Sequence, residues 1–239
     1  MAISTLSILF FGFLLGLKHA VEADHIAAVS TIVTERKSLW SSAIIGGIWG
    51  LGHTISLLAV GILVILLEFR VSSQMENILE FFVGIMLLFL GINVIQKMFR
   101  GGQLHFHKHE HGEHLHAHPH LHEDIHTANE PHTHHGFSLA PRPLIIGMVH
   151  GLAGSAGLML LVLPTIESQT IGLLYIIIFG LGSIGGMMLM SMLVSLPLYL
   201  TALHFNRLNN LLKLFAGLFS ICIGLWIIYE KGFADKPII

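Results

Sequence analysis

The chain has 239 residues, of which 54% are hydrophobic and only 11% are charged, and its formal net charge is −2. A soluble domain carries roughly a quarter charged residues, so this composition excludes that class. The apolar runs are continuous and do not alternate with period two, which excludes transmembrane strands. We therefore predict an all-α integral membrane protein that lies in the lipid bilayer and has no nucleic-acid partner.

Six stretches are long and apolar enough to cross a bilayer, which takes roughly 20 residues. They run approximately over 4–33, 40–67, 76–99, 142–164, 170–201 and 208–230. The first, second and fifth exceed what a bilayer requires, so we expect tilt, a break or an extension beyond it. The chain then divides into a first three-helix unit (1–100), a connector (101–141) and a second three-helix unit (142–239).

The first apolar stretch contains the segment His19-Ala-Val-Glu-Ala-Asp-His-Ile26. Its two histidines and two carboxylates are costly at membrane depth and are usually kept there by function. Imidazole and carboxylate together suit divalent Ni, Co, Zn, Mn or Fe. The segment therefore predicts a metal site inside the membrane, and the alternative is a polar contact between helices.

Helical geometry limits how this segment can act. At 100° per residue, Glu22 lies about 60° from His19, whereas Asp24 lies roughly 140° away, almost on the opposite face. An unbroken helix cannot direct His19, Asp24 and His25 at one ion. We expect either a distortion within about residues 18–25 or an Asp24 that acts on the ligands instead of the metal. Glu22 is a candidate to balance charge or orient an imidazole.

An internal repeat is readable in the apolar stretches. Gly16-Leu-Lys-His19-Ala matches Gly147-Met-Val-His150-Gly, Trp49-Gly-Leu-Gly-His53 matches Phe179-Gly-Leu-Gly-Ser183, and the segment that begins at Asn77 and ends at Gly84 matches the one from Asn210 to Gly217. The offsets are 131, 130 and 133 residues, in the same order. Each unit has an odd number of spans, so the second enters the bilayer inverted, and such repeats hold their substrate near the midplane.

The repeat adds two histidines to the candidate site. It predicts that His19 and His150 face one another across a pseudo-two-fold axis. His53, taken alone, fits a hydrogen bond between helices as well as a metal ligand. Its place at the repeat-matched Gly-x-Gly favours the site, and the predicted metal residues are therefore His19, Glu22, Asp24, His25, His53 and His150.

The connector 101–141 breaks the apolar pattern, with thirteen histidines between His105 and His135. It has few apolar residues, so we expect it to be disordered. Histidine-rich tracts bind metals, Zn2+ included, without a packed core. We expect metal buffering or handover here, and a pH-responsive loop is the alternative.

Lysine and arginine near the span ends predict the orientation. Eight lie on the side of the connector, and three lie on the side of the termini. We therefore expect a cytoplasmic connector in a protein of the cell membrane, with both termini outside.

These motifs resemble the nickel/cobalt transporter (NiCoT) family, especially its shorter UreH-type branch associated with urease. The family's His-x4-Asp-His hallmark is met by His19, Asp24 and His25, and its second motif by Leu51-Gly52-His53-Thr54. The connector resembles that of RcnA-type efflux proteins. The resemblance implies Ni2+ or Co2+ permeation, with the hallmark residues selecting the metal. Glu22 stands where many members carry Asp, and Gly151-Leu-Ala-Gly-Ser155 replaces an acidic motif of longer members.

We predict a permease for divalent transition-metal cations, with uptake of nickel or cobalt that supplies urease, and not an enzyme. A cytoplasmic metallochaperone is an expected partner. No Gly-x-x-x-x-Gly-Lys-(Ser/Thr) motif is present, so ion gradients would drive transport. The alternatives are nickel or cobalt efflux, an intramembrane metalloenzyme and a metal sensor.

Overall fold

The computed structural model describes residues 5–36, 38–66, 72–100, 105–111, 114–120, 141–153, 168–202 and 205–234. Within these ranges the fold is helical, apart from one two-stranded ribbon. The helices are α1 (Thr5–His19), α2 (Ala23–Ile32), α3 (Leu39–Leu66), α4 (Ser73–Arg100), α5 (Pro141–Ala153), α7 (Gln169–Ala202) and α8 (Asn206–Tyr229), with short turns η1 (Val33–Glu35) and η3 (Glu230–Ala234).

The long helices match the apolar stretches. Helices α3, α4, α7 and α8 together with η3 are long and apolar enough to span a membrane, and α1 with α2 forms a fifth candidate bent by 56°. The described residues thus hold four or five candidate spans, where the sequence predicts six. The remaining expected span, 142–164, begins as α5, and its residues after Ala153 lie outside the described part of the chain.

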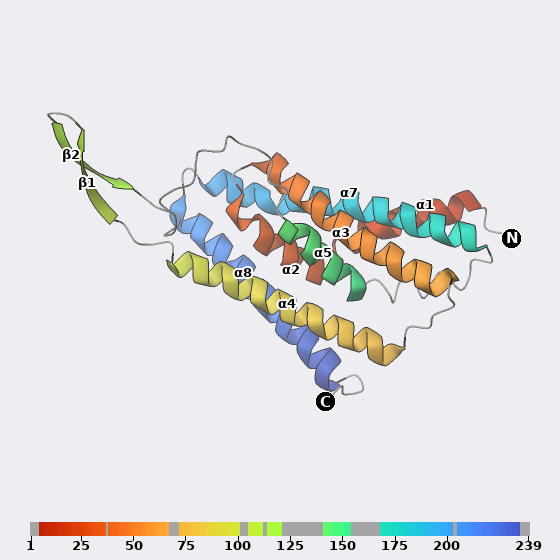
Figure 1. The fold of residues 1–239 in the computed structure, drawn as a ribbon. Coiled ribbons are helices and arrows are strands. Elements are labelled where there is room, and N and C mark those ends of the chain that lie inside the picture. The colour runs from red at the N-terminus through yellow and green to blue at the C-terminus, as the bar shows by residue number, and fades with distance from the viewer. Residues whose placement is uncertain are drawn as a thin grey trace.

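The helices form two groups (Figure 1). Helices α3 and α7 pack along each other, with α1 against α7 and α5 against α3, while α4 pairs with α8. Helix α2 contacts α4, α7 and α8, so it lies between the groups. The apolar core follows α2 and includes Ala27, Trp49, Leu87 and Met187. The break between α1 and α2 is therefore near the centre of the bundle.

Glycines let α1 and α5 approach their neighbours closely. A Cβ atom on Gly16 of α1 would collide with the carbonyl oxygen of Phe179 in α7, and one on Gly147 of α5 would collide with that of Trp49 in α3. Gly16 matches Gly147 in the sequence repeat, and Phe179 matches Trp49. The same contact between the two halves of the chain therefore occurs twice, with the roles of the halves exchanged.

The pairing of α4 with α8 has the same character. A Cβ atom on Gly84 would lie 2.9 Å from the carbonyl oxygen of Gly224, and one on Gly224 would lie 2.7 Å from that of Gly84. Gly91 and Gly217 meet in the same reciprocal way. Small residues are what allow membrane helices to pack this closely. Because both helices contribute glycine at both crossings, their backbones are in direct contact.

Two short segments of the histidine-rich connector form a ribbon. Strand β1 (His105–His111) pairs antiparallel with β2 (His114–His120), and the ribbon projects beyond the helices (Figure 1). The register places His105 opposite His120 and His107 opposite His118, and the next two histidines of β1 are also opposite histidines. Alternation with period two in both strands produces this match. The other connector residues lie outside the described ranges, apart from the first residue of α5.

Candidate metal centre

The helix break predicted near residues 18–25 is confirmed. Helix α1 ends at His19 and α2 begins at Ala23, with a turn closed by the bond from Glu22 N to the carbonyl oxygen of His19 at 3.1 Å. Glu22 has an extended backbone with φ −68° and ψ 152°, which is incompatible with a continuous helix. The break removes the angular restriction of a straight helix and lets side chains on both sides of it converge.

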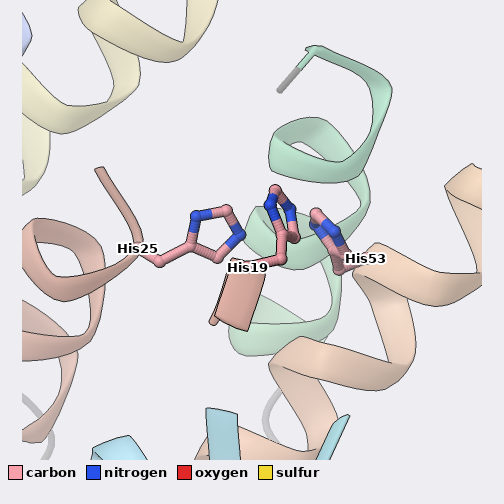
Figure 2. Close-up of side chains that lie close together, drawn as sticks. All are labelled: His19, His25 and His53. Carbon is pink, nitrogen blue, oxygen red and sulfur yellow. The ribbon is translucent and has the colours of Figure 1, made fainter. Parts of the chain in front are cut away.

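Four histidines from four helices meet at this break. His19 ends α1, His25 lies in the first turn of α2, His53 lies in α3 and His150 in α5, and each is fully buried. The ring centroid of His25 lies 4.3 Å from that of His19 and 4.2 Å from that of His150, and the His19 and His53 centroids are 5.2 Å apart. Figure 2 shows the rings of His19, His25 and His53 beside one another.

The predicted carboxylates contact these imidazoles directly. Asp24 Oδ1 lies 2.9 Å from His25 Nδ1, and Asp24 Oδ2 lies 3.0 Å from His150 Nε2. Glu22 Oε2 lies 2.8 Å from His19 Nδ1. The structure thus brings together all six residues predicted for the site. Both carboxylate oxygens of Asp24 contact histidines, which agrees with the alternative in which Asp24 acts on the metal ligands instead of the metal.

These contacts determine which ring nitrogens are available. An ionised carboxylate accepts hydrogen bonds only, so the nitrogen facing it carries the proton and the other nitrogen has a lone pair. The hydrogen bonds of Asp24 thus leave lone pairs at His25 Nε2 and His150 Nδ1. Both atoms are buried without a hydrogen-bond partner among the described residues, as are both nitrogens of His53 and of His19, whose Nδ1 has Glu22 within ion-pair distance but not in hydrogen-bond geometry.

This pattern fits a metal ion. Buried polar atoms nearly always have partners, and a buried one without a partner costs roughly 1–3 kcal/mol. Ligand atoms of His19, His25 and His53 lie within 4.8 Å of one another, as do those of Asp24, His25 and His150. Donors in a tetrahedral site with bonds of about 2.0–2.1 Å are about 3.3 Å apart, which lies within that limit.

Two aromatic rings border the cluster, at positions that stand out in the sequence only as repeat matches. Trp49 packs against His150 with ring centroids 5.5 Å apart, and Phe179 packs against His19 at 5.7 Å. Their matched positions in the repeat were a signal that both face the histidines. Such rings keep water from the imidazoles without offering a competing ligand. Ser155, which ends the segment that replaces the acidic motif, lies outside the described residues.

Fold and site together define a multi-pass helical membrane protein with a buried histidine–carboxylate cluster that is compatible with metal binding. The chain is 39% identical over 233 residues to the urease accessory protein UreH of Bacillus sp. (strain TB-90), covering 98% of this chain and 95% of the relative. The chain therefore belongs to the UreH family of urease accessory proteins, which confirms the predicted UreH-type resemblance. No family model matches it, and no solved structure matches it.

Proposed function

We propose that this protein is a permease that carries a divalent transition-metal cation, Ni2+ or Co2+, into the cell, where it supplies urease. The observation that carries the proposal is the set of buried imidazole nitrogens left without partners, among the described residues, at the α1–α2 break. A broken helix near the midplane is a frequent place for a transporter's substrate. The family's link to urease supports nickel as the cargo.

The proposed ligands are His19 Nε2, His25 Nε2, His53 and His150 Nδ1, with Asp24 and Glu22 holding the rings. Carboxylates bonded to the far nitrogen of a ligating histidine fix its orientation and raise its basicity. Two ionised carboxylates also offset the charge of one divalent ion, which lowers the cost of placing that ion in a buried site. Imidazole donors alone do not distinguish Ni2+ from Co2+.

Transport fits the described residues better than catalysis does. A hydrolytic nucleophile is activated by a neighbouring base within hydrogen-bonding distance. The buried hydroxyls of Ser183 and Ser191 have no hydrogen-bond partner within the described ranges. Neither serine is thus prepared as a nucleophile, which disfavours serine catalysis, and the metalloenzyme alternative, whose nucleophile would be a metal-bound water, is tested by hydrolytic turnover of the purified protein.

Two inverted three-helix repeats are the proposed architecture. The paired contacts support it: Gly182 would meet the carbonyl oxygen of Phe13, and its repeat partner Gly52 would meet that of Leu144. Phe13 and Leu144 are themselves separated by the repeat offset of 131 residues. A further pair of equivalent contacts is the packing of His19 against Phe179 and of His150 against Trp49. Equivalent contacts of this kind are expected from a pseudo-two-fold axis through the cluster.

The excess of lysine and arginine near the connector supports a cytoplasmic connector with both termini outside. In that orientation the histidine-rich segment would receive the ion after passage, hold Ni2+ or Zn2+ and pass it to a cytoplasmic metallochaperone. The register of β1 and β2, with a histidine opposite a histidine at four positions, supports metal capture by this segment. The Cβ atoms of residues directly opposite each other in an antiparallel pair lie about 4.5–5.5 Å apart.

Flux through the purified protein tests the proposal. In liposomes loaded with a metal-sensitive dye, we expect Ni2+ entry with the wild type and none with His19→Ala or His25→Ala. Ser30→Ala is a matched control, because Ser30 is buried in α2 and donates its hydroxyl to the carbonyl oxygen of Ala27 in the same helix. Equal Ni2+ flux in the histidine variants and in the control would show that His19 and His25 are not part of the transport site.

Direction is tested separately in cells. Cells that express the protein should accumulate more nickel than cells with an empty vector. A nickel content below that of the empty-vector cells would indicate efflux instead of import. The cytoplasmic connector would then collect the ion for export. A wild type that binds Ni2+ but shows no flux in liposomes would replace the permease with a metal sensor.

A further inference from the structure

A cavity lies beside the histidine cluster, between the two helix groups. Its volume is about 200 Å3, and it is lined by Glu22, Asp24, Glu80, Val83, Ala153 and Ile227. Glu80 and Val83 belong to α4 and Ile227 to α8, whereas Glu22 and Asp24 belong to the α1–α2 break. We call this cavity the acidic vestibule, because half of its lining residues carry carboxylates.

Two walls of the acidic vestibule are also parts of the histidine cluster. Glu22 lies 2.8 Å from His19 Nδ1, and Asp24 contacts both His25 and His150. The histidines themselves have no exposed surface, so an ion must reach them past other groups. The histidines give evidence that is independent of the carboxylates. His19 Nε2 and His25 Nε2 have no hydrogen-bond partner among the described residues, which indicates that a ligand binds on the far side of Glu22 and Asp24 from the cavity.

Glu80 extends the acidic vestibule away from the cluster. It lies seven residues into α4, about 10 Å along the helix axis. Its Oε2 atom lies 3.1 Å from Nζ of Lys231, which follows the end of α8 in η3. One turn further inward, Val83 and Ile227 form the apolar lining. The ion pair therefore lies toward the end of the bundle where α4 begins and α8 ends.

The Glu80–Lys231 pair is not needed to hold α4 and α8 together. Those helices already meet backbone to backbone at Gly84–Gly224 and Gly91–Gly217. The pair is also only partly screened from solvent, with side-chain exposures of 24% for Glu80 and 22% for Lys231. Ion pairs that remain in contact with solvent contribute little stability. The chemistry of the pair, rather than its stability, explains its position beside the cavity.

We propose, on the basis of the proposed transport function, that the acidic vestibule is the passage between solvent and the histidine cluster, and that Glu80 draws the divalent cation into it. Three carboxylates focus an attractive field on a cation in a cavity with apolar walls. The Lys231 ammonium is a tethered monovalent cation that neutralises Glu80 while the passage is empty. A divalent ion interacts more strongly with the same carboxylate and displaces the ammonium.

Glu80→Gln tests this role. We expect the rate of Ni2+ flux into liposomes to fall roughly tenfold, as the loss of electrostatic steering predicts, whereas equilibrium Ni2+ binding by the purified protein stays within twofold of the wild type. Glu230→Gln is the matched control, because Glu230 precedes Lys231 and is outside the lining. Glu80→Asp should recover part of the flux. Unchanged flux in Glu80→Gln would overturn the proposal.

A second measurement keeps the test valid if Glu80→Gln fails to fold. Ile227→Cys, in a Cys222→Ser background, should react with a cationic, membrane-impermeant methanethiosulfonate, because Ile227 lines the acidic vestibule and is only partly buried. Leu87→Cys is the control, since Leu87 lies in α4, fully buried and outside the lining. Equal inertness of both cysteines would exclude a water-filled passage. Failure of the proposed function is distinct: the wild type itself would then show no flux.

Discussion

Asp24 Oδ2 lies 3.0 Å from His150 Nε2 and joins two residues that are 126 positions apart in the sequence. The other oxygen of Asp24 contacts His25, its immediate neighbour. One carboxylate thus connects the first half of the chain to the second at the point where α1 and α2 separate. The bond adds a polar contact to a histidine ring that is otherwise held by packing against His25 and Trp49.

Replacing this carboxylate by an amide should weaken metal binding without unfolding the protein. The Asp24→Asn substitution keeps the size of the side chain and one acceptor oxygen, but the new amide group donates toward a ring nitrogen and the negative charge is lost. Loss of such a carboxylate typically costs 10–100-fold in metal affinity. Equilibrium dialysis with Ni2+ measures the change, and thermal unfolding in detergent should show little loss of stability. Wild-type affinity in Asp24→Asn would show that Asp24 does not position the imidazoles.

The histidines should behave as one unit. Removing His19 or His53 each leaves an incomplete ligand set, so the two effects are coupled and do not add. We expect His19→Ala and His53→Ala each to abolish high-affinity Ni2+ binding, with the double variant no worse than either one. A double-mutant cycle on Ni2+ dissociation constants checks this. Strictly additive losses would mean that His19 and His53 bind separate ions or none.

The sequence signals for the helices and for the residues that meet at the α1–α2 break were local. Continuous apolar runs gave α3 as 40–67 where the helix is Leu39–Leu66, and α7 as 170–201 where it is Gln169–Ala202. The angle between His19 and Asp24 on an ideal helix was enough to predict either a distorted helix or an Asp24 that acts on the ligands, and the helix is bent by 56° there. Costly ionisable groups in an apolar stretch indicated function, since function is what usually keeps them there.

What the sequence could not give was the partner of each group. Asp24 was expected to act on the ligands if not on the metal, but its contacts with His25 and His150 depend on the turn at residues 20–22, which rotates α2 relative to α1. Such a rotation depends on how α2 packs between the helix groups, which no local pattern encodes. Glu80 carried no signal at all in the sequence. Its significance comes only from the cavity that α4 and α8 form with the break.

The position of His150 should depend on the close contact at Gly147, one turn earlier in α5. An added Cβ at Gly147 would collide with the carbonyl oxygen of Trp49 and lie 2.9 Å from Trp49 Cδ1, so Gly147→Ala must displace α5 from α3. Overpacking of this kind costs about 1–3 kcal/mol and should also lower Ni2+ affinity by moving His150. Thermal unfolding and Ni2+ titration measure the two effects.

Gly185→Ala is the control for that substitution. Gly185 lies in α7 with nothing within 4 Å of an added Cβ among the described residues, so no displacement is required. Alanine is favoured over glycine within helices by about 1 kcal/mol, so Gly185→Ala should keep or raise the unfolding temperature and leave Ni2+ affinity unchanged. If Gly147→Ala were equally harmless, the contact between α5 and α3 would be looser than the structure has it.

Deletion of residues 103–135 should separate metal capture by the connector from passage through the bundle. The deletion removes the β1–β2 ribbon and all thirteen connector histidines but none of the residues at the α1–α2 break. We expect the number of Ni2+ ions bound per chain to fall, while flux at saturating Ni2+ persists, because the four buried histidines are intact. Atomic absorption on the dialysed protein and dye-loaded liposomes give the two values. Replacing the same histidines by asparagine keeps the length of the connector and serves as the control. A complete loss of flux in both variants would place the essential metal ligands in the connector and not at the helix break.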